Sequence, residues 1–198
     1  MSLKRSYTLI APVYDSVVRA ALARARAESL RDLPTAPSGR VLVNGIGTGL
    51  DLPHLPAAHE YVGLDLTAAM LRRAQAIDPH RRAALVQGDA MRLPFRDESF
   101  DHAVLHLILA VVPQPITCLR ETARVVRHGG TVLVLDKFLR PGERAYLRRA
   151  LSPLAAVVAT RLDVVFEDLL TQVSDLMLKS DQPALFGSWF RRIRLERR

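Results

Sequence analysis

The sequence predicts an α/β fold, with a mostly parallel sheet whose two faces are covered by helices. Strand-like and helix-like segments alternate through residues 40–138, and this alternation is typical of right-handed crossovers between parallel strands. The run at residues 103–105 is apolar without interruption, as expected for a strand buried on both faces. The first apolar run ends in Gly45, Gly47 and Gly49, at a strand end where sheets of this kind bind ligands.

The expected elements are short and closely spaced. Thr67 is expected to cap a helix at its N-terminus. The His-Gly-Gly sequence at residues 128–130 is expected to cap a second helix at its C-terminus and to turn the chain. The strands are expected at residues 40–44, 60–64, 84–87, 99–106 and 131–135, and the helices at residues 50–55, 67–76 and 116–127.

The glycines at residues 45–49 follow the spacing G-x-G-x-G. Without side chains they let a ligand lie against bare backbone, and the N–H groups that open the next helix face that ligand. A dinucleotide fingerprint needs its third glycine at position 50, which is Leu50. Asp65 follows Gly45 by 20 residues, where a nucleotide-binding unit places an acid on ribose hydroxyls. A nucleotide-like ligand is predicted; a glycine-rich turn without a ligand is the alternative.

Residues 3–31 are expected to form a helical segment before the sheet. An apolar stripe edged by arginines can lie on a membrane surface, or it can dock on the chain's own sheet. The alanine-rich stripe favours docking, and Pro34, Pro37 and Gly39 end the segment as a linker. The stripe consists of Val17, Val18, Ala21, Leu22 and Ala25, flanked by Arg19, Arg24, Arg26 and Arg31.

The last third of the chain is less regular. In its final strand, Ile193 and Leu195 fall on one face and Arg192 and Arg194 on the other. Helices are expected at residues 141–154 and 163–173, and strands at residues 176–179 and 189–195.

Composition narrows the class of protein. With 198 residues, 49% of them hydrophobic and 24% charged, the chain suits one soluble domain with a sizeable core. We find no membrane-spanning run, no signal peptide and no metal-ligand spacing. The single Cys118 fits a reducing compartment, so we expect a cytoplasmic protein. The net charge of +8 would attract anionic partners; a bias toward arginine is the alternative.

Five segments within residues 40–138 carry a connected set of motifs: VLVNGIGTGLDLPHL, YVGLDLTAAML, LVQGDAMRLPFRDESFD, LILAVVPQP and CLRETARVVRHGGTVLVLD. In this order and spacing they resemble the successive motifs of the class I S-adenosylmethionine (SAM) methyltransferases. They are most similar to a group of small enzymes that includes quinone-biosynthesis C-methyltransferases and bacterial phosphatidylethanolamine N-methyltransferases. Residues 7–15 also resemble the N-terminal segment of that group.

The resemblance implies a Rossmann-like sheet of seven strands in the order 3-2-1-4-5-7-6, with SAM as the cofactor. It also implies one methyltransferase domain over residues 1–198. In that domain, residues 1–35 would form an N-terminal helical cap and residues 40–138 the SAM-binding core. Residues 139–198 would supply C-terminal helices and an antiparallel strand pair.

The resemblance also assigns cofactor contacts. The glycines would hold the methionine end of SAM, and Asp65 the ribose hydroxyls. Leu66 and Met70 would line the adenosine, and Asp89 with Ala90 would meet the adenine, although Gly-Asp is also a common turn dipeptide. The full implied set is Asn44, Gly45, Ile46, Gly47, Gly49, Asp65, Leu66, Met70, Asp89, Ala90, Met91, His106 and Leu107.

The chain departs from the family at Asn44, where an acid is usual. An amide cannot neutralise the ammonium group of the cofactor, so we expect weaker SAM binding or another carboxylate in its place. Three side chains are candidate general bases for an acceptor that needs one: His106, Asp136 and Tyr14. For His106 the favoured alternative is a cofactor-wall or core histidine, and Asp136 could merely cap its strand.

The methyl acceptor is expected to be a small molecule. Features of the sequence point to a hydrophobic or lipid-like acceptor. A nucleic-acid acceptor is less favoured, because the loop at residues 107–115 is apolar, whereas enzymes that methylate amino groups of nucleic acids carry a polar loop there. Cys118 lies in an expected helix, where it is poorly placed to attack a pyrimidine, and no RNA-binding module is present. The basic surface and the N-terminal segment suggest peripheral contact with an anionic membrane surface. A protein that binds SAM or another nucleotide without transferring a methyl group is the alternative.

Overall fold

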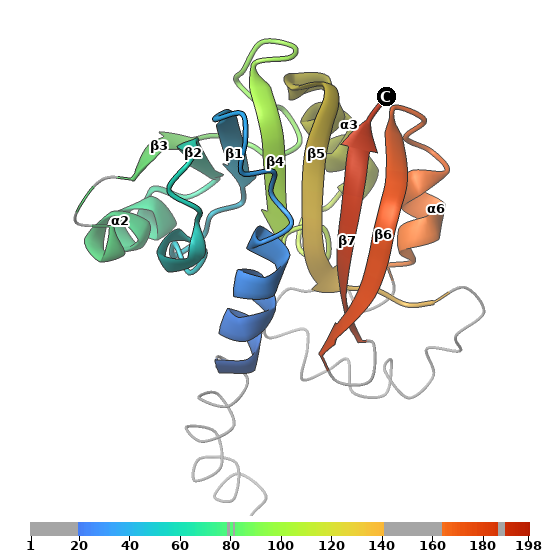
Figure 1. Ribbon diagram of the computed structural model, residues 1–198, viewed down its shortest axis with the longest axis horizontal. Coiled ribbons are helices and arrows are strands. Elements are labelled where there is room, and N and C mark those ends of the chain that lie inside the picture. The colour runs from blue at the N-terminus through green and yellow to red at the C-terminus, as the bar shows by residue number, and fades with distance from the viewer. Residues whose placement is uncertain (1–19, 79, 81, 141–163, 186–188) are drawn as a thin grey trace, which may run out of the picture.

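The computed structural model describes residues 20–78, 80, 82–140, 164–185 and 189–198, and these contain a seven-stranded sheet (Figure 1). The strand order is β3-β2-β1-β4-β5-β7-β6, so the predicted fold class and sheet order are confirmed. The strands are β1 (Arg40–Asn44), β2 (Glu60–Asp65), β3 (Ala83–Gln87), β4 (Phe100–His106), β5 (Val126–Lys137), β6 (Leu176–Leu185) and β7 (Phe190–Arg197).

β7 runs opposite to the other strands. β1 pairs in parallel with β2 and β4, β2 pairs in parallel with β3, and β4 pairs in parallel with β5. β7 lies between β5 and β6 and pairs antiparallel with both. The carboxyl ends of β1, β2, β4 and β5 therefore meet along one edge of the sheet, which is the edge where such folds bind ligands.

Helices cover both faces of the sheet. Thr67 caps α2 as predicted, because its Oγ1 accepts a hydrogen bond from the N–H of Met70 at 3.4 Å. The described helices are an N-terminal helix at residues 20–30, η1 (Leu52–His54), α2 (Ala68–Ile77), α3 (Pro115–Val125) and α6 (Phe166–Leu170).

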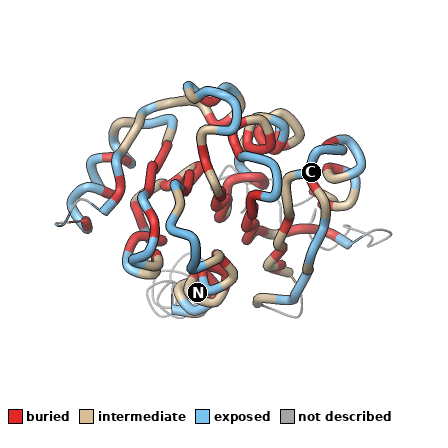
Figure 2. Tube along the Cα trace, turned by 45° about the horizontal axis from the view of Figure 1, so that its top comes forward, coloured by how far each residue is buried: buried red, intermediate tan, exposed pale blue. Residues whose placement is uncertain are grey.

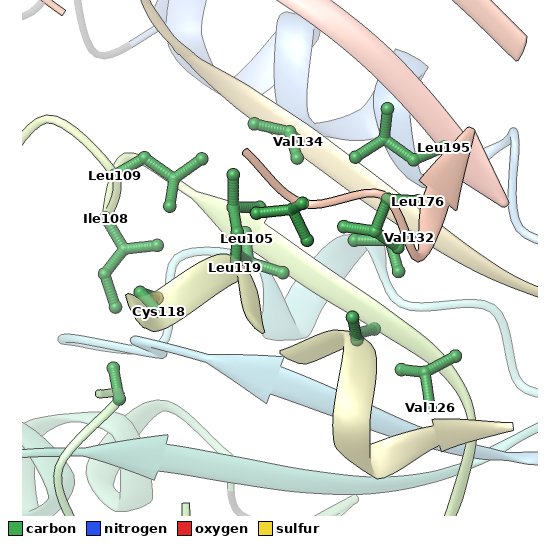
Figure 3. Close-up of a cluster of buried hydrophobic side chains, with 14 of the residues drawn as sticks. Leu105, Ile108, Leu109, Cys118, Leu119, Val126, Val132, Val134, Leu176 and Leu195 are labelled. Carbon is green, nitrogen blue, oxygen red and sulfur yellow. The ribbon is translucent and has the colours of Figure 1, made fainter. Parts of the chain in front are cut away.

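One hydrophobic core fills the space between the sheet and the helices α3 and α6. Leu105, Val132 and Leu195 come from three neighbouring strands and pack with Cys118 and Leu119 of α3 (Figure 3). Successive side chains of a strand point to opposite faces, so each strand supplies this core with alternate residues only.

A second core lies on the opposite face, under the N-terminal helix, η1 and α2. Leu30, Val43, Leu52, Leu71 and Val104 belong to it. Burial is concentrated along the central strands (Figure 2). These strands supply apolar side chains to both cores. The near-continuous apolar character of these strands follows from this double coverage.

The N-terminal helix is docked on the chain's own sheet, as the favoured interpretation predicts. Ala25 and Leu30 are buried. Arg26, which was expected to flank the apolar stripe, is itself only 7% exposed, because it forms a buried ion pair with Asp51. Val17, Val18 and Arg19 lie outside the described residues.

The helix cap and turn predicted at residues 128–130 were wrong. α3 ends at Val125, and the extended Val126 already pairs with Phe100 of β4. The next pairing joins His102 to Thr131, so residues 127–130 form a bulge within β5 rather than a helix cap. Gly129 has φ of 75°, which a bulge and a helix C-cap both favour.

The C-terminal strand pair is present, with changed boundaries. Ile193 and Leu195 are buried on one face of β7, as predicted, while Arg192 and Arg194 are partly exposed. β6 is longer than expected, and α6 is shorter. The helix expected at residues 141–154 lies outside the described residues.

His102 on β4 predicts a loss of stability as the pH falls. Its Nδ1 accepts a hydrogen bond from the Thr131 N–H at 3.1 Å, and its ring packs edge-on against His59. Burial, together with His59, lowers the pKa of His102 from 6.5 to about 4. Between these values the unfolded chain binds a proton that the folded protein does not, so stability falls as the pH drops from 6.5 to about 4. The full loss is at most about 3 kcal/mol.

Urea unfolding at about pH 7 and about pH 5 measures this loss. His102→Asn keeps an acceptor for the Thr131 N–H and is expected to lose less stability between the two pH values than the unmodified protein. The matched comparison is needed because burial raises the pKa of Asp136 to about 6, which adds stability over the same range as the pH falls. An equal pH dependence in the two proteins would exclude His102 as the cause.

Candidate cofactor-binding site

The glycine loop leaves the carboxyl end of β1 and is fixed by its own backbone. The N–H groups of Gly45 and Ile46 both donate to the carbonyl of Leu64 at 2.9 Å. The φ angles of Gly45, Gly47 and Gly49 are 78°, 56° and 82°. Glycine is the residue that adopts these values at the lowest energetic cost.

The three glycines have different surroundings. A Cβ at Gly45 would lie 2.3 Å from Cδ1 of Ile108, and a Cβ at Gly49 would lie 3.0 Å from the Cα of Ala74. A Cβ at Gly47 would meet only the Gly45 carbonyl oxygen, at 4.0 Å. Gly45 and Gly49 are therefore required by packing, whereas Gly47 borders open space that a ligand can fill.

Asp65 lies at the end of β2, beside the glycine loop. Its Oδ2 accepts the N–H of Gly47 at 3.0 Å, and its Oδ1 accepts the N–H of Thr67 at 2.9 Å and the Thr67 hydroxyl at 3.2 Å. A carboxylate has about four acceptor sites, and three are used by these protein donors, so about one remains for a ligand hydroxyl. The geometry fits the role in ribose binding that the sequence predicts.

A pocket of about 340 Å³ opens between the glycine loop, the end of β2 and the chain after β4. Seven of the predicted cofactor residues line it, which is the spatial convergence that the sequence predicts at this edge. The predicted residues are Gly45, Gly47, Asp65, Leu66, Met70, Ala90 and Leu107, and the other lining residues are Leu64, Thr67, Ile108 and Val111.

Other predicted contacts do not line this pocket. Ile46 is 4% exposed and packs in the core under the N-terminal helix and α2. Gly49 packs against α2. Asp89 accepts the N–H of Met91 at 2.8 Å, which is the hydrogen bond of a simple turn. Met91 is half-buried and packs against the opposite core.

The side chain of Asn44 does not face the pocket, so the prediction of a cofactor contact for its amide was wrong. It is fully buried under α3, where Nδ2 donates to Thr122 Oγ1 at 3.3 Å and lies 3.6 Å from Cys118 Sγ. Asn44 follows Val43, which points to the other core, and strand alternation therefore turns Asn44 toward α3.

His106 is locked in a buried polar cluster. Its Nδ1 is 2.7 Å from Asp51 Oδ1, its Nε2 is 3.0 Å from Ser29 Oγ, and its side chain is 0% exposed. The same Asp51 oxygen accepts a hydrogen bond from Arg26 Nη1 at 2.7 Å. Both ring nitrogens are occupied and His106 does not line the pocket, so the geometry is unlike that of a free general base and favours the alternative of a core histidine.

Asp136 holds the chain after β4 in place. Its Oδ2 accepts the N–H of Ala110 at 3.0 Å, and its Oδ1 accepts the N–H of Lys137 at 2.8 Å. The residue is 0% exposed. Its carboxylate therefore anchors the segment that carries Ile108 and Val111 into the pocket, which matches the capping alternative rather than a base that reaches an acceptor.

The structure does not test the third candidate base, Tyr14, and it disfavours a reactive cysteine. Tyr14 lies outside the described residues. Cys118 is buried in α3, and burial raises the pKa of its thiol to about 12, so a reactive thiolate is disfavoured. Within the described ranges, no cluster of three or more metal-ligating side chains is present.

Sequence reasoning missed both the pocket wall after β4 and the polar cluster. Ile108 and Val111 belong to an apolar loop that gives no signal beyond its position after a strand. Asp51 follows Gly49 by two residues, and this proximity could have drawn attention to it. Its partners Arg26 and Ser29 come from a distant segment and carry no motif.

The residues that line the pocket suit SAM in their chemistry. Gly47 leaves bare backbone with free space, and Asp65 presents a carboxylate for hydroxyls. Leu66 is 65% exposed and Met70 is 36% exposed, so apolar surface is available to an aromatic base beside the carboxylate.

Comparisons with known proteins agree with this site. A family model described as a methyltransferase domain matches residues 42–134. A phosphatidylethanolamine N-methyltransferase of Cereibacter sphaeroides is 34% identical over 170 residues, which covers 82% of each chain. A demethylmenaquinone methyltransferase of a Roseiflexus species is 36% identical, covering 78% of this chain and 70% of the relative. Among solved structures, the YcgJ protein of Bacillus subtilis superimposes with a TM-score of 0.70 at 21% identity, covering 84% of this chain and 75% of that chain.

The chain belongs to the class I SAM-dependent methyltransferases. It is an enzyme of that family and uses SAM as its methyl donor. Within the class, its relatives include the phosphatidylethanolamine and demethylmenaquinone methyltransferases.

Proposed function

We propose that this methyltransferase acts on a small hydrophobic or lipid-like acceptor, either a quinone or the amine of a phospholipid. SAM supplies an activated methyl group, and the protein must hold the acceptor in line with it and away from water. The cofactor lies in the glycine-loop pocket in this proposal, with Gly47, Asp65 and Leu107 among its contacts.

The observation that carries the proposal is the apolar mouth of the pocket. Val111 is 49% exposed, and it lines the pocket together with Ile108. Exposed apolar side chains that gather around a pocket mark a surface meant to be covered by a ligand. The two relatives named above act, by their names, on a lipid amine and on a quinone precursor.

Acid-base chemistry gives some preference for the amine. A neutral amine attacks a methyl donor without help, whereas a carbon or oxygen acceptor needs a base. His106 and Asp136 are both buried and hydrogen-bonded, so neither supplies that base in the described structure. The base-free reaction asks only for positioning and exclusion of water.

We further propose that the enzyme is cytoplasmic and touches an anionic membrane surface peripherally. No helix in the described ranges has both the length and the apolar character needed to cross a bilayer. The N-terminal helix uses Ala25 and Leu30 for internal packing, so the contact would use the exposed Arg72 and Arg73 of α2 beside Met70. Binding to vesicles that does not depend on anionic lipid would refute this contact.

Methyl transfer from radiolabelled SAM into a total cell extract tests the acceptor class. The extract is then partitioned between organic and aqueous phases. We expect label in the organic phase with the unmodified protein and none with Asp65→Ala. Glu60→Gln, an exposed residue at the opposite end of β2, is the matched control and should label as the unmodified protein does.

Label in the aqueous phase would refute a lipid-like acceptor and direct the search to soluble metabolites. Label in the organic phase that persists in Asp65→Ala would mean that another enzyme in the extract carried out the transfer. Mass spectrometry of the labelled lipid then separates the two candidate acceptors, because an N-methyl group and a ring C-methyl group fragment differently.

A further inference from the structure

We propose that a buried polar cluster couples SAM binding to the docking of the N-terminal helix, with Asp51 and His106 as positioning residues for the pocket. The cluster consists of Arg26, Ser29, Asp51 and His106. The inference rests on the cofactor pocket proposed above and is independent of the acceptor.

The cluster is compact and charge-balanced. Asp51 Oδ1 lies 2.7 Å from Arg26 Nη1 and 2.7 Å from His106 Nδ1, and Ser29 Oγ lies 3.0 Å from His106 Nε2. All four residues are less than one tenth exposed. An ionised Asp51 requires a hydrogen on Nδ1, so in the neutral ring Nε2 accepts the Ser29 hydroxyl. Removal of one member leaves a buried polar group without its partner, which is costly.

The order Ser29–His106–Asp51 has the connectivity of a hydrolytic triad, but the geometry excludes that role. Ser29 is 2% exposed on the N-terminal helix and does not line the pocket. A nucleophile must reach its substrate and needs an oxyanion site beside it. Arg26 also occupies the Asp51 carboxylate. The arrangement is a link between segments rather than a reactive site.

Two members of the cluster lie next to segments that line the pocket. Asp51 follows Gly49 by two residues, at the end of the glycine loop whose Gly45 and Gly47 line the pocket, and the Leu52 N–H beside it donates to the Gly49 carbonyl at 3.0 Å. His106 precedes Leu107, which lines the pocket and has φ of 60°, an uncommon value for a leucine. The cluster therefore sets the relative positions of both walls.

The other two members belong to the N-terminal helix. Arg26 and Ser29 lie on one face of residues 20–30, and neither touches the pocket itself. The helix is also held by Glu28, which pairs with Arg192 of β7 at 3.1 Å, outside the cluster. A ligand that requires both pocket walls in this arrangement will favour the docked helix, and the docked helix will favour the ligand by the same factor.

Binding and proteolysis of three variants test the coupling. The probe is S-adenosylhomocysteine, the demethylated cofactor. Calorimetry gives its Kd, and mass spectrometry gives the rate of tryptic cleavage after the exposed Arg24 and Arg31 with and without it. Ser29→Ala removes one hydrogen bond and no charge, and Asp51→Asn removes the central charge. Glu28→Gln loosens the same helix outside the cluster and is the control.

In the unmodified protein we expect the probe to slow cleavage about tenfold. In Ser29→Ala the Kd should rise about tenfold, and the probe should hardly slow cleavage. Asp51→Asn should show the same pattern more strongly; if it does not fold, Ser29→Ala decides. Glu28→Gln should be cleaved faster throughout yet keep the unmodified Kd and the slowing by the probe.

Equal behaviour of Ser29→Ala and Glu28→Gln in both measurements would overturn the coupling, because the cluster would then act only as packing. An unmodified protein that does not bind the probe would overturn the cofactor pocket and the coupling together. Normal coupling without label in the organic phase would refute only the lipid-like acceptor.

Discussion

Gly47→Ala is expected to remove cofactor binding while the protein stays folded. Gly47 lines the pocket, and its new Cβ would meet no protein atom closer than 4.0 Å. The residue has φ of 56°, which alanine adopts at a cost of about 1 kcal/mol. The methyl group would occupy space that bare backbone leaves to the ligand, so we expect the Kd for S-adenosylhomocysteine to rise about 100-fold.

Gly49→Ala is the matched control and should lower the stability of the fold, because Gly49 is a packing residue that does not line the pocket. Its Cβ would lie 2.6 Å from Leu52 Cδ1 and 3.0 Å from the Ala74 backbone, so overpacking adds to the φ strain. We expect a loss of about 3 kcal/mol in unfolding free energy, measured by urea unfolding. If Gly47→Ala destabilises the protein as much as Gly49→Ala does, then Gly47 is a packing residue and not a ligand contact.

Asp65→Ala is expected to weaken the binding of S-adenosylhomocysteine by about 10- to 100-fold. A hydrogen bond from a hydroxyl to a charged acceptor contributes about 1.5–3 kcal/mol, and the Asp65 carboxylate has about one acceptor site left for a ribose hydroxyl. The same change frees the N–H groups of Gly47 and Thr67, which are partly reached by water, so the stability loss should be only about 1 kcal/mol.

Thr67→Ala separates the two roles of Asp65. It removes the hydroxyl that donates to Asp65 and the side-chain cap of α2 but keeps the carboxylate. We expect a stability loss of about 1 kcal/mol with a much smaller change in Kd than in Asp65→Ala. Urea unfolding gives the loss of stability, and calorimetry at equal fractions of folded protein gives the Kd. A normal Kd in Asp65→Ala would remove Asp65 from the site.

The strands and the glycine loop were predictable because their signals are local. Apolar runs buried on both faces are continuous in sequence, and the spacing from Gly45 to Asp65 reflects the connection after β1, which contains η1, and the strand β2. The pocket wall after β4 was located only by its position, because Ile108 and Val111 differ little from core residues.

The failures arose where a side chain's direction depends on tertiary packing. Asn44 was assigned to the cofactor by motif position, although strand alternation with Val43 already turned it toward the other face. The partners of His106 lie 55 and 77 residues away in the chain, and only the docking of the N-terminal helix brings them together. The glycine at position 129 fits both a helix cap and a bulge, so sequence alone did not decide between them.

The position of β7 imposes an order on folding during synthesis. Among the residues that the structure describes, β6 has no neighbour in the sheet except β7, and β5 has β7 on its outer side. While the ribosome is still adding Phe190–Arg197, β6 is therefore an unpaired strand and β5 carries an open edge, and both are surfaces on which nascent chains aggregate. Strands β1 to β4 can assemble early. Strands β5 and β6 can complete the sheet only after β7 has been synthesised and has paired between them.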